Sequence, residues 1–196
     1  GLTGDMTNME TMFAVKNLFQ KTLNSSFLDS RAKHTYINFE NRSNYLFNSG
    51  IEGIEESDLI LLIGTNPRFE ATILNSRIRK TYLKNKTEIF SLEDVGDLTY
   101  PYKVLENNSK VIDKIIKNEH DLSNKITSAE KPIIILGQSI LNSNNGAYIF
   151  EELKRYLTSI NKIDENWNAL NILSTDASAV GSYDLGIFSS NDGSNK

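Results

Sequence analysis

A short loop after an apolar run carries the clearest potential for binding chemistry in this sequence. Its residues are Gly64, Thr65, Asn66 and Pro67. Pro67 suits the first position of a helix and Asn66 can cap that helix, which predicts unpaired backbone N–H groups just beyond the cap. Together with the positive end of the helix dipole and Arg68, these donors predict a cradle for a phosphate or a carboxylate. The same residues would equally serve as an ordinary helix cap, and the G-x-G-x-x-G spacing of a dinucleotide site is absent.

The other residue types that support catalysis or metal binding lack a motif. His34 and His120 are far apart and outside H-E-x-x-H spacing, so no histidine metal site is expected. Ser139 and Ser143 lack the G-x-S-x-G elbow and are predicted to be turn residues. The acidic pairs at 55–56 and 93–94 are predicted to be solvated charges, and Trp167 a packing residue.

Composition excludes further classes of function. The chain contains no cysteine, which rules out cysteine nucleophiles, thiolate zinc sites and cysteine-ligated iron–sulfur clusters within it. We therefore predict no catalytic residue and no metal site. A net charge of −4 argues against nucleic acid as a partner. No stretch approaches the roughly 20 apolar residues of a membrane span, and 39% hydrophobic with 23% charged residues favours a globular protein.

Hydrophobic spacing predicts alternating helices and strands that would position the loop. Residues 8–23 are predicted to be a helix with Thr7 and Glu10 as a capping box, and residues 35–39 a short strand. A brief helix is expected within 42–48. The near-continuous apolar run 59–63 is typical of a parallel strand that is covered on both faces. An amphipathic crossover helix should follow, with its apolar side formed by Phe69, Ile73, Leu74, Ile78 and Tyr82.

The second half of the chain repeats this order. A strand is expected at 86–90, an irregular region around 96–102 and a helix near 111–116. KPIIILGQSILNSNNG, residues 131–146, is again an apolar strand that ends at a glycine, Gly137, with a polar loop and a helix after it. A last strand or short helix is expected at 169–173. Two such units predict an α/β fold with a doubly wound, mostly parallel sheet and helices on both faces, whose ligands bind outside the carboxyl ends of the strands. We predict one domain over 1–188 and a flexible tail at 189–196.

Residues 42–83 resemble a known family. GTNPRFEATILNSRIRK is the most specific part of this stretch, and the resemblance continues through DLTYPY, PIIILGQSIL and NWNALNILSTDASAVGSYDLG. The chain is similar to the large iron–sulfur subunit of respiratory complex I, NADH:ubiquinone oxidoreductase, in its molybdopterin-oxidoreductase-like region. In molybdenum enzymes of this fold, loops after the strands hold a pterin guanine dinucleotide. The corresponding positions here are Gly64, Thr65, Asn66, Pro67 and Gly137.

The resemblance implies a noncatalytic scaffold domain in the peripheral arm of complex I, which supports the electron path from NADH to ubiquinone. It implies vestigial pterin loops, no cofactor in this chain, and iron–sulfur clusters on a partner or missing segment. The implied partners are the other peripheral-arm subunits, above all the cluster-bearing part of the same subunit. The implied location is the matrix side of the mitochondrial inner membrane or the cytoplasmic side of a bacterial one. Because the family subunit is longer, we expect a split, processed or partial product.

Two other interpretations remain open from the sequence. One is a fragment of a molybdopterin-dependent oxidoreductase, and the other is a stand-alone nucleotide-binding module that uses the helix start at Asn66. For the scaffold, the candidate interface residues are Arg68, Arg77 and Arg79, because they lie on one amphipathic helix and could pair with acidic groups of a neighbour.

Overall fold

The computed structural model describes residues 1–4, 6–30, 35–106, 108 and 110–188. The chain forms two compact units, one of Gly1–Tyr45 and Ser174–Lys196 and the other of Leu46–Leu173. The parallel sheet lies within the second unit, so the domain predicted over 1–188 includes more than the sheet and its helices. The predicted tail at 189–196 and His34 lie outside the described residues.

Five parallel strands make up the sheet unit. They are β1 (Leu59–Ile63), β2 (Glu88–Ser91), β3 (Lys103–Val104), β4 (Pro132–Gly137) and β5 (Leu170–Leu173), in the order β3-β2-β1-β4-β5. The chain starts in the middle of the sheet, builds outward through β2 and β3, then returns to the other side of β1. This is the doubly wound topology that the two repeated units predict, and the prediction is confirmed.

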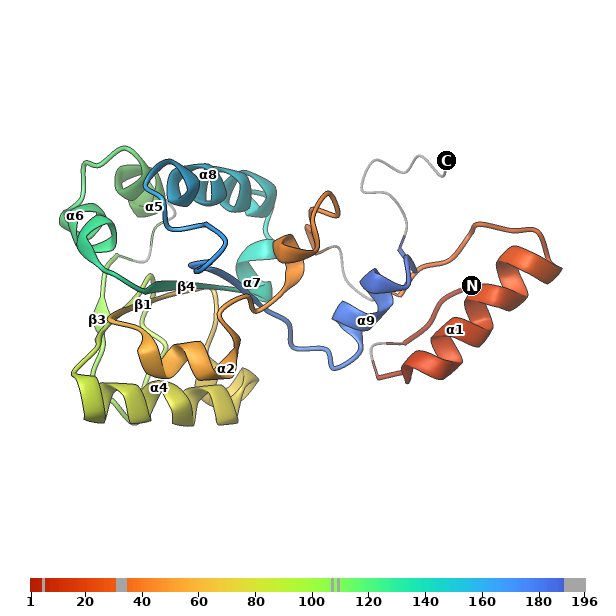
Figure 1. Ribbon diagram of the computed structural model, residues 1–196, viewed down its shortest axis with the longest axis horizontal. Coiled ribbons are helices and arrows are strands. Elements are labelled where there is room, and N and C mark those ends of the chain that lie inside the picture. The colour runs from red at the N-terminus through yellow and green to blue at the C-terminus, as the bar shows by residue number, and fades with distance from the viewer. Residues whose placement is uncertain (5, 31–34, 107, 109, 189–196) are drawn as a thin grey trace. The chain divides into compact units, whose positions relative to one another are not determined.

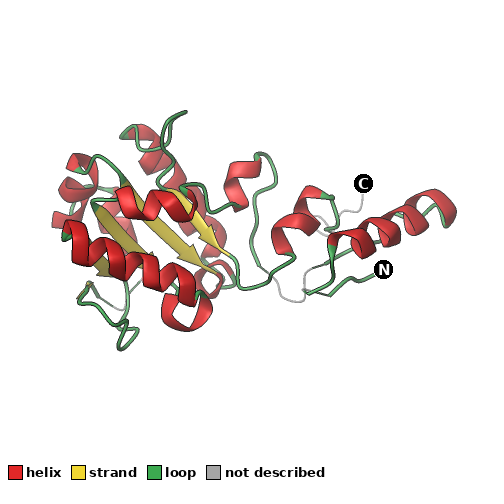
Figure 2. Cartoon of the chain, turned by 60° about the horizontal axis from the view of Figure 1, so that its bottom comes forward, coloured by secondary structure: helices red, strands yellow, loops and turns green. Residues whose placement is uncertain are grey.

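Helices cover both faces of this sheet (Figures 1 and 2). On one face lie α2 (Gly50–Gly53), the 3₁₀ turn Ile54–Glu56 and the long helix α4 (Thr72–Asn85). On the other lie α5 (Lys110–Ile116), α6 (Asp121–Ser128) and α8 (Gly146–Ser159). Two short helices, α3 (Pro67–Glu70) and α7 (Gln138–Leu141), begin directly after β1 and β4. The predicted sandwich of helices around a parallel sheet is therefore present.

The central strands are buried along their whole length. Every residue of β1 and of β4 is buried, because both strands have neighbours on each side and helices above and below. Beneath α4, Ile60 and Leu62 pack with Leu74 and Ile78 of that helix. Full burial of such a side chain contributes about 1.5–3 kcal/mol. This core makes the strand ends a rigid edge on which loops can be placed.

The crossover after β1 differs from the single helix that spacing predicts. The chain leaves helical geometry at Ala71, with φ −152° and ψ 71°, so α3 and α4 are separate helices. Leu74 and Ile78 are buried as predicted, but Phe69 is 79% and Ile73 68% exposed. The apolar stripe expected at Phe69 and Ile73 is therefore wrong. The break at Ala71 places Phe69 on a separate short helix, and Ile73 lies on the exposed side of α4.

Further along the chain, two elements were not predicted. The helix α6 begins at a cap formed by His120, whose Nδ1 accepts a hydrogen bond from the N–H of Leu122 at 3.0 Å. The strand β3 has only two residues and pairs with Phe90 and Ser91. A two-residue strand of exposed residues has no hydrophobic alternation to reveal it.

The other unit contains α1 (Met9–Asn17), the π-helical turn Leu18–Thr22, the 3₁₀ turn Arg42–Tyr45 and α9 (Ala179–Asp184). Its small core is formed by Met12, Leu28 and Ile187. Arg42 donates two hydrogen bonds to the carboxylate of Asp184, at 2.8 and 2.7 Å, and thereby lowers the pKa of that carboxyl group. Segments from the two ends of the chain thus hold this unit together.

Two local predictions in this unit are corrected. The N-cap of α1 is Asn8, whose Oδ1 accepts from the N–H of Thr11 at 2.9 Å, and not Thr7. Residues 35–39 form no strand. Thr35 and Ile37 are buried in the alternating manner that suggested one, so the burial pattern was right and the conformation was wrong.

Candidate functional site

The sheet places the two glycine-ended strands side by side at its centre. β1 and β4 are neighbours, with Ile63 opposite Leu136 in the register, so the loops that begin at Gly64 and Gly137 emerge next to each other. Strand order reverses between these two strands. In doubly wound sheets, ligands bind at this switch point, outside the carboxyl ends of the strands. The structure thus brings Gly64, Thr65, Asn66, Pro67 and Gly137 together at the edge where a site is expected.

Gly64 allows the first loop to turn sharply. Its φ is +62°, a left-handed conformation that favours glycine. A Cβ at this position would lie 2.7 Å from the Cβ of Ile140 and 2.8 Å from the Oγ of Ser139. Glycine is therefore required for both its backbone conformation and its lack of a side chain.

Gly137 brings the second loop directly against the first. A Cβ here would overlap the carbonyl oxygen of Gly64 and lie 2.6 Å from the Cβ of Thr65. The hydroxyl of Ser139 donates a hydrogen bond to the same Gly64 carbonyl at 2.5 Å. The two loops are therefore in direct contact at the switch point.

Asn66 and Pro67 begin α3 as the sequence predicts. Pro67 occupies the first turn, and the side chain of Asn66 accepts from the N–H of Arg68 at 3.2 Å. The N–H groups of Phe69 and Glu70 donate to the carbonyl of Asn66, at 3.1 and 3.0 Å. The expectation of unpaired donors beyond the cap is therefore wrong for these groups.

Glu70 completes the cap in a way that sequence reasoning missed. Its carboxylate accepts from the hydroxyl of Thr65 at 2.6 Å and from the backbone N–H of Asn66 at 3.1 Å. The available sequence signal was an acidic residue in the first turn of the helix, where the free N–H groups favour negative charge. The predicted cradle thus already holds an anion, and that anion belongs to the chain.

The guanidinium of Arg68 lies against the irregular segment after β2. Its Nη1 donates to the carbonyl and to the carboxylate of Asp97, both at 2.6 Å. The pKa of Asp97 is lowered by the N–H of Thr99 and by Arg68. Asn66 adds a second contact to this segment, because its Nδ2 donates to the carbonyl of Val95 at 2.8 Å. The charge of Arg68 therefore stabilises a loop contact.

The remaining two candidate arginines differ from each other. Arg77 pairs with Glu55, which also accepts from Lys80 at 2.7 Å, and the two cations lower the pKa of Glu55, Lys80 most strongly. Arg79 is exposed and forms no ion pair with any residue that the structure describes. Of the three arginines predicted to face a partner, Arg68 and Arg77 have carboxylate partners inside the chain, whereas Arg79 has none among the described residues.

Tyr100 and Asn75 form a buried hydrogen-bonded pair between the segment after β2 and α4. The hydroxyl of Tyr100 donates to the Oδ1 of Asn75 at 2.7 Å, and the Nδ2 of Asn75 donates to the carbonyl of Leu98 at 3.0 Å. Tyr100 and Asn75 are 7% and 6% exposed, and burial raises the pKa of Tyr100. These contacts tie α4 to the DLTYPY segment, which the sequence analysis treated as irregular.

The other described residues that the sequence analysis considered for catalysis or binding make contacts that stabilise the fold. The Oγ of Ser143 donates to the carbonyl of Ile140 at 2.7 Å, as expected of a turn residue. Trp167 packs on the core beneath α4, and its Nε1 donates to the carbonyl of Pro132 at 2.9 Å, which confirms a packing role. Glu56 pairs with Lys131. Asp94 accepts from the hydroxyl of Tyr102 at 2.9 Å.

The described part of the chain contains neither a cluster of metal ligands nor a membrane-spanning helix. Within it, His, Asp and Glu side chains form no group of three or more that could hold a metal ion. No helix there combines the length and the apolar character that crossing a bilayer requires.

Comparison with known proteins identifies the family. Residues 1–196 match the family model of molybdopterin oxidoreductases. The chain is 35% identical over 199 residues to the NADH-ubiquinone oxidoreductase 75 kDa subunit of Reclinomonas americana, covering 95% of this chain and 29% of that relative. It is also 35% identical over 190 residues to the mitochondrial 78 kDa subunit of the same enzyme from Neurospora crassa, with 94% and 25% covered.

A plant relative gives the same result. The mitochondrial NADH dehydrogenase [ubiquinone] iron-sulfur protein 1 of Solanum tuberosum is 30% identical over 193 residues, covering 98% of this chain and 26% of the relative. The chain thus spans between 25% and 29% of the length of these three relatives. The resemblance that residues 42–83 carry to the large subunit of complex I is confirmed across most of the chain. By its family match and its parallel α/β sheet, the chain belongs to the molybdopterin oxidoreductase family.

Proposed function

We propose that the chain is a noncatalytic scaffold domain of the peripheral arm of respiratory complex I, where it supports the electron path from NADH to ubiquinone. The observation that carries this proposal is that the chain's own groups pair and pack at the switch point. The carboxylate of Glu70 occupies the cradle at Thr65 and Asn66, and Gly137 packs directly on Gly64. We propose complex I as the assembly because the relatives are named as parts of the NADH–ubiquinone oxidoreductase.

The loop residues do not fit the pterin guanine dinucleotide of molybdenum enzymes. A phosphate at the cradle would meet the negative charge of Glu70, and the N–H groups of Asn66, Arg68, Phe69 and Glu70 already have acceptors in the chain. Like charges at short range repel each other. We therefore propose that Gly64, Thr65, Asn66, Pro67 and Gly137 are vestigial pterin-loop positions that hold the fold together.

The proposed partners are the other peripheral-arm subunits, with the iron–sulfur clusters held outside residues 1–196. This chain contains no cysteine that could ligate them. The proposed location is the matrix side of the mitochondrial inner membrane, which the mitochondrial relatives favour over the cytoplasmic side of a bacterial membrane.

Membership is tested on native gels. Membranes are solubilised mildly, complexes are separated, and the band with in-gel NADH dehydrogenase activity is analysed by mass spectrometry. Peptides of this chain are expected in that band in amounts comparable to those of other complex I subunits. Their confinement to smaller species without the activity would overturn the proposal.

The noncatalytic role is tested by chemistry on the same band. Molybdenum and tungsten are measured by mass spectrometry of the metals, and pterin by its fluorescence after oxidation. All three should be far below one per complex. Stoichiometric metal and pterin would instead establish the molybdopterin-dependent oxidoreductase.

The nucleotide-binding module is tested by titration with ATP and NAD. No saturable binding at the Asn66 helix start is expected, because the donors there are already used. Saturable binding that Arg68→Ala abolishes and Arg79→Ala leaves intact would support the module and contradict the scaffold.

A further inference from the structure

The outward face of α4 combines exposed apolar and basic side chains. Ile73, Ser76, Lys80 and Leu83 follow at spacings of three and four, which places them on one side of the helix. Ile73 is 68% and Leu83 59% exposed. The opposite side, with Leu74 and Ile78, is buried in the core. Helix α4 therefore has one face in the core and another that presents apolar groups to the outside.

Positive charge is concentrated on this helix. Thr72–Asn85 contains four basic residues and no acidic residue, in a chain whose net charge is −4. The basic residues are Arg77, Arg79, Lys80 and Lys84. Glu55 pairs with Arg77 and Lys80, whereas Arg79 and Lys84 form no ion pair with the residues that the structure describes. Two cations of this face are thus available to an external anion.

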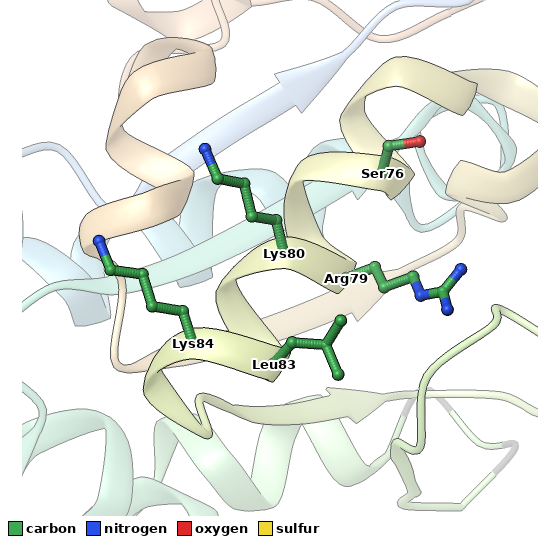
Figure 3. A pocket seen from close by; sticks show the side chains of 5 residues that line it. All are labelled: Ser76, Arg79, Lys80, Leu83 and Lys84. Atoms are coloured by element: carbon green, nitrogen blue, oxygen red, sulfur yellow. The ribbon is translucent and has the colours of Figure 1, made fainter.

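The free cations flank a shallow hollow on the helix surface (Figure 3). The hollow has a volume of about 430 Å³ and is lined by Ser76, Arg79, Lys80, Leu83 and Lys84. Around the hollow, Lys80 and Lys84 point toward one edge of this outward face, whereas Arg79 and Leu83 point toward its other edge (Figure 3). Small-molecule sites are concave and enclosed on several sides. A hollow lined by one helix fits protruding side chains of a polypeptide better than a small ligand.

We propose that the outer face of α4, formed by Ile73, Ser76, Arg79, Lys80, Leu83 and Lys84, docks on an acidic polypeptide surface outside residues 1–196. Carboxylates of that surface pair with Arg79 and Lys84, and an apolar side chain covers Leu83. The inference rests on the proposed function, because it requires a multi-subunit assembly. It also replaces Arg68 and Arg77 as interface residues, since both have carboxylate partners within the chain.

Charge and geometry favour a protein over a membrane. An amphipathic helix binds lipid by inserting a continuous apolar face. The face of α4 with Leu74 and Ile78 is buried in the core, and on the exposed face Ile73 and Leu83 are separated by polar and basic residues. Scattered apolar groups ringed by complementary charges are typical of protein interfaces, where the charges set orientation and association rate.

The first experiment uses the assembled complex from native membranes. A carbodiimide joins a lysine amine to a carboxylate that it touches, without a spacer. We expect a cross-link between Lys84 and an Asp or Glu outside residues 1–196. Acetylation of Lys84 in the complex should also be at least fivefold slower than in the denatured chain. Full reactivity of Lys84 without a cross-link would overturn the docking face.

A lipid partner is distinguished in the same experiment. Protection of Lys84 that disappears on delipidation, without any protein cross-link, would assign the face to lipid and overturn the proposal. Protection that persists in delipidated complex with the cross-link present supports it.

Charge reversal gives the second readout. Arg79→Glu with Lys84→Glu should reduce the fraction of the chain in the NADH dehydrogenase band about tenfold. The matched control is Lys110→Glu at the start of α5 with Lys117→Glu directly after its last residue. It makes the same charge change at exposed lysines, and α5 covers the opposite face of the sheet. Equal incorporation of both variants would contradict the proposal.

The outcomes separate this inference from the proposed function. If the wild-type chain is in the complex but Lys84 stays reactive, only the docking face is overturned. If the wild-type chain migrates alone with reactive Lys84, both are overturned.

Discussion

Gly137 lies so close to Gly64 that a Cβ on Gly137 would overlap the Gly64 carbonyl oxygen. The two glycines end the central strands of the sheet, which in ligand-binding relatives of this architecture flank the site. Here they are in contact, and Ser139 adds a hydrogen bond from the second loop to the first. The two loops at this edge are thus tied to each other by backbone packing and a hydrogen bond.

Gly137→Ala should destabilise the sheet unit by about 1–3 kcal/mol, because the added methyl group meets backbone atoms that cannot move independently. Urea denaturation followed by circular dichroism measures the loss. Gly4→Ala is the control, since a Cβ there would have its nearest neighbour, the Oγ1 of Thr7, at 3.7 Å. A Gly137→Ala protein as stable as the wild type would show that the loops are not packed as described.

Glu70→Ala should lower the free energy of unfolding by about 1 kcal/mol, because it removes the acceptor for both the Thr65 hydroxyl and the Asn66 N–H. Glu70→Gln retains one side-chain oxygen and should cost less. Denaturation of both variants gives the comparison. Equal stability of Glu70→Ala and wild type would remove Glu70 from the cap.

Tyr100→Phe should cost about 1–3 kcal/mol, because the buried Oδ1 of Asn75 loses its donor. Tyr82→Phe is the matched control. Its hydroxyl has no hydrogen bond to any residue that the structure describes, and changes at such positions stay within about 0.5 kcal/mol. Thermal and urea unfolding measure the stability of both variants. If Tyr100→Phe loses no more free energy of unfolding than Tyr82→Phe, the buried hydrogen bond between Tyr100 and Asn75 is contradicted.

Glu88 makes stability depend on pH. Its carboxylate accepts from Lys103 at 2.8 Å and from Lys125 at 2.6 Å, and these cations lower its pKa, Lys103 most strongly. A lowered pKa contributes stability above the unfolded value of about 4.3, and this contribution is lost as pH falls through the folded pKa. Because Glu88 is 42% exposed, each pair should contribute only about 0–1 kcal/mol.

The contribution of Glu88 to stability is tested by measuring the free energy of unfolding of wild type and Glu88→Gln at several pH values. Wild type should be the more stable protein at pH 7, and the difference should shrink as pH falls below the unfolded value of about 4.3 and through the lowered folded pKa of Glu88. High salt at pH 7 should reduce the difference as well, because exposed pairs are screened. A difference that is constant from pH 7 to pH 3 would rule out the ion pairs as its cause.

The central sheet and its loop ends were predictable because they are encoded locally. Residues 59–63 and 132–137 are apolar at every position, and a short run of this kind is typical of a strand that is covered on both faces. Asn66 and Pro67 indicate the start of a helix, because Asn is favoured at the N-cap and Pro at the first helical position. The absence of cysteine by itself excludes thiolate ligation within the chain.

The partners of the polar side chains were decided only by the tertiary structure. Arg68 meets Asp97, 29 residues away, and Arg77 meets Glu55, 22 residues away, so two predicted interface charges are used inside the fold. Residues 35–39 alternate like a strand yet form none. The pairing of Arg42 with Asp184 joins segments 142 residues apart. Hydrophobic periodicity reports which side of a segment is buried, but charges and loops find partners through the register of distant segments, which no local pattern contains.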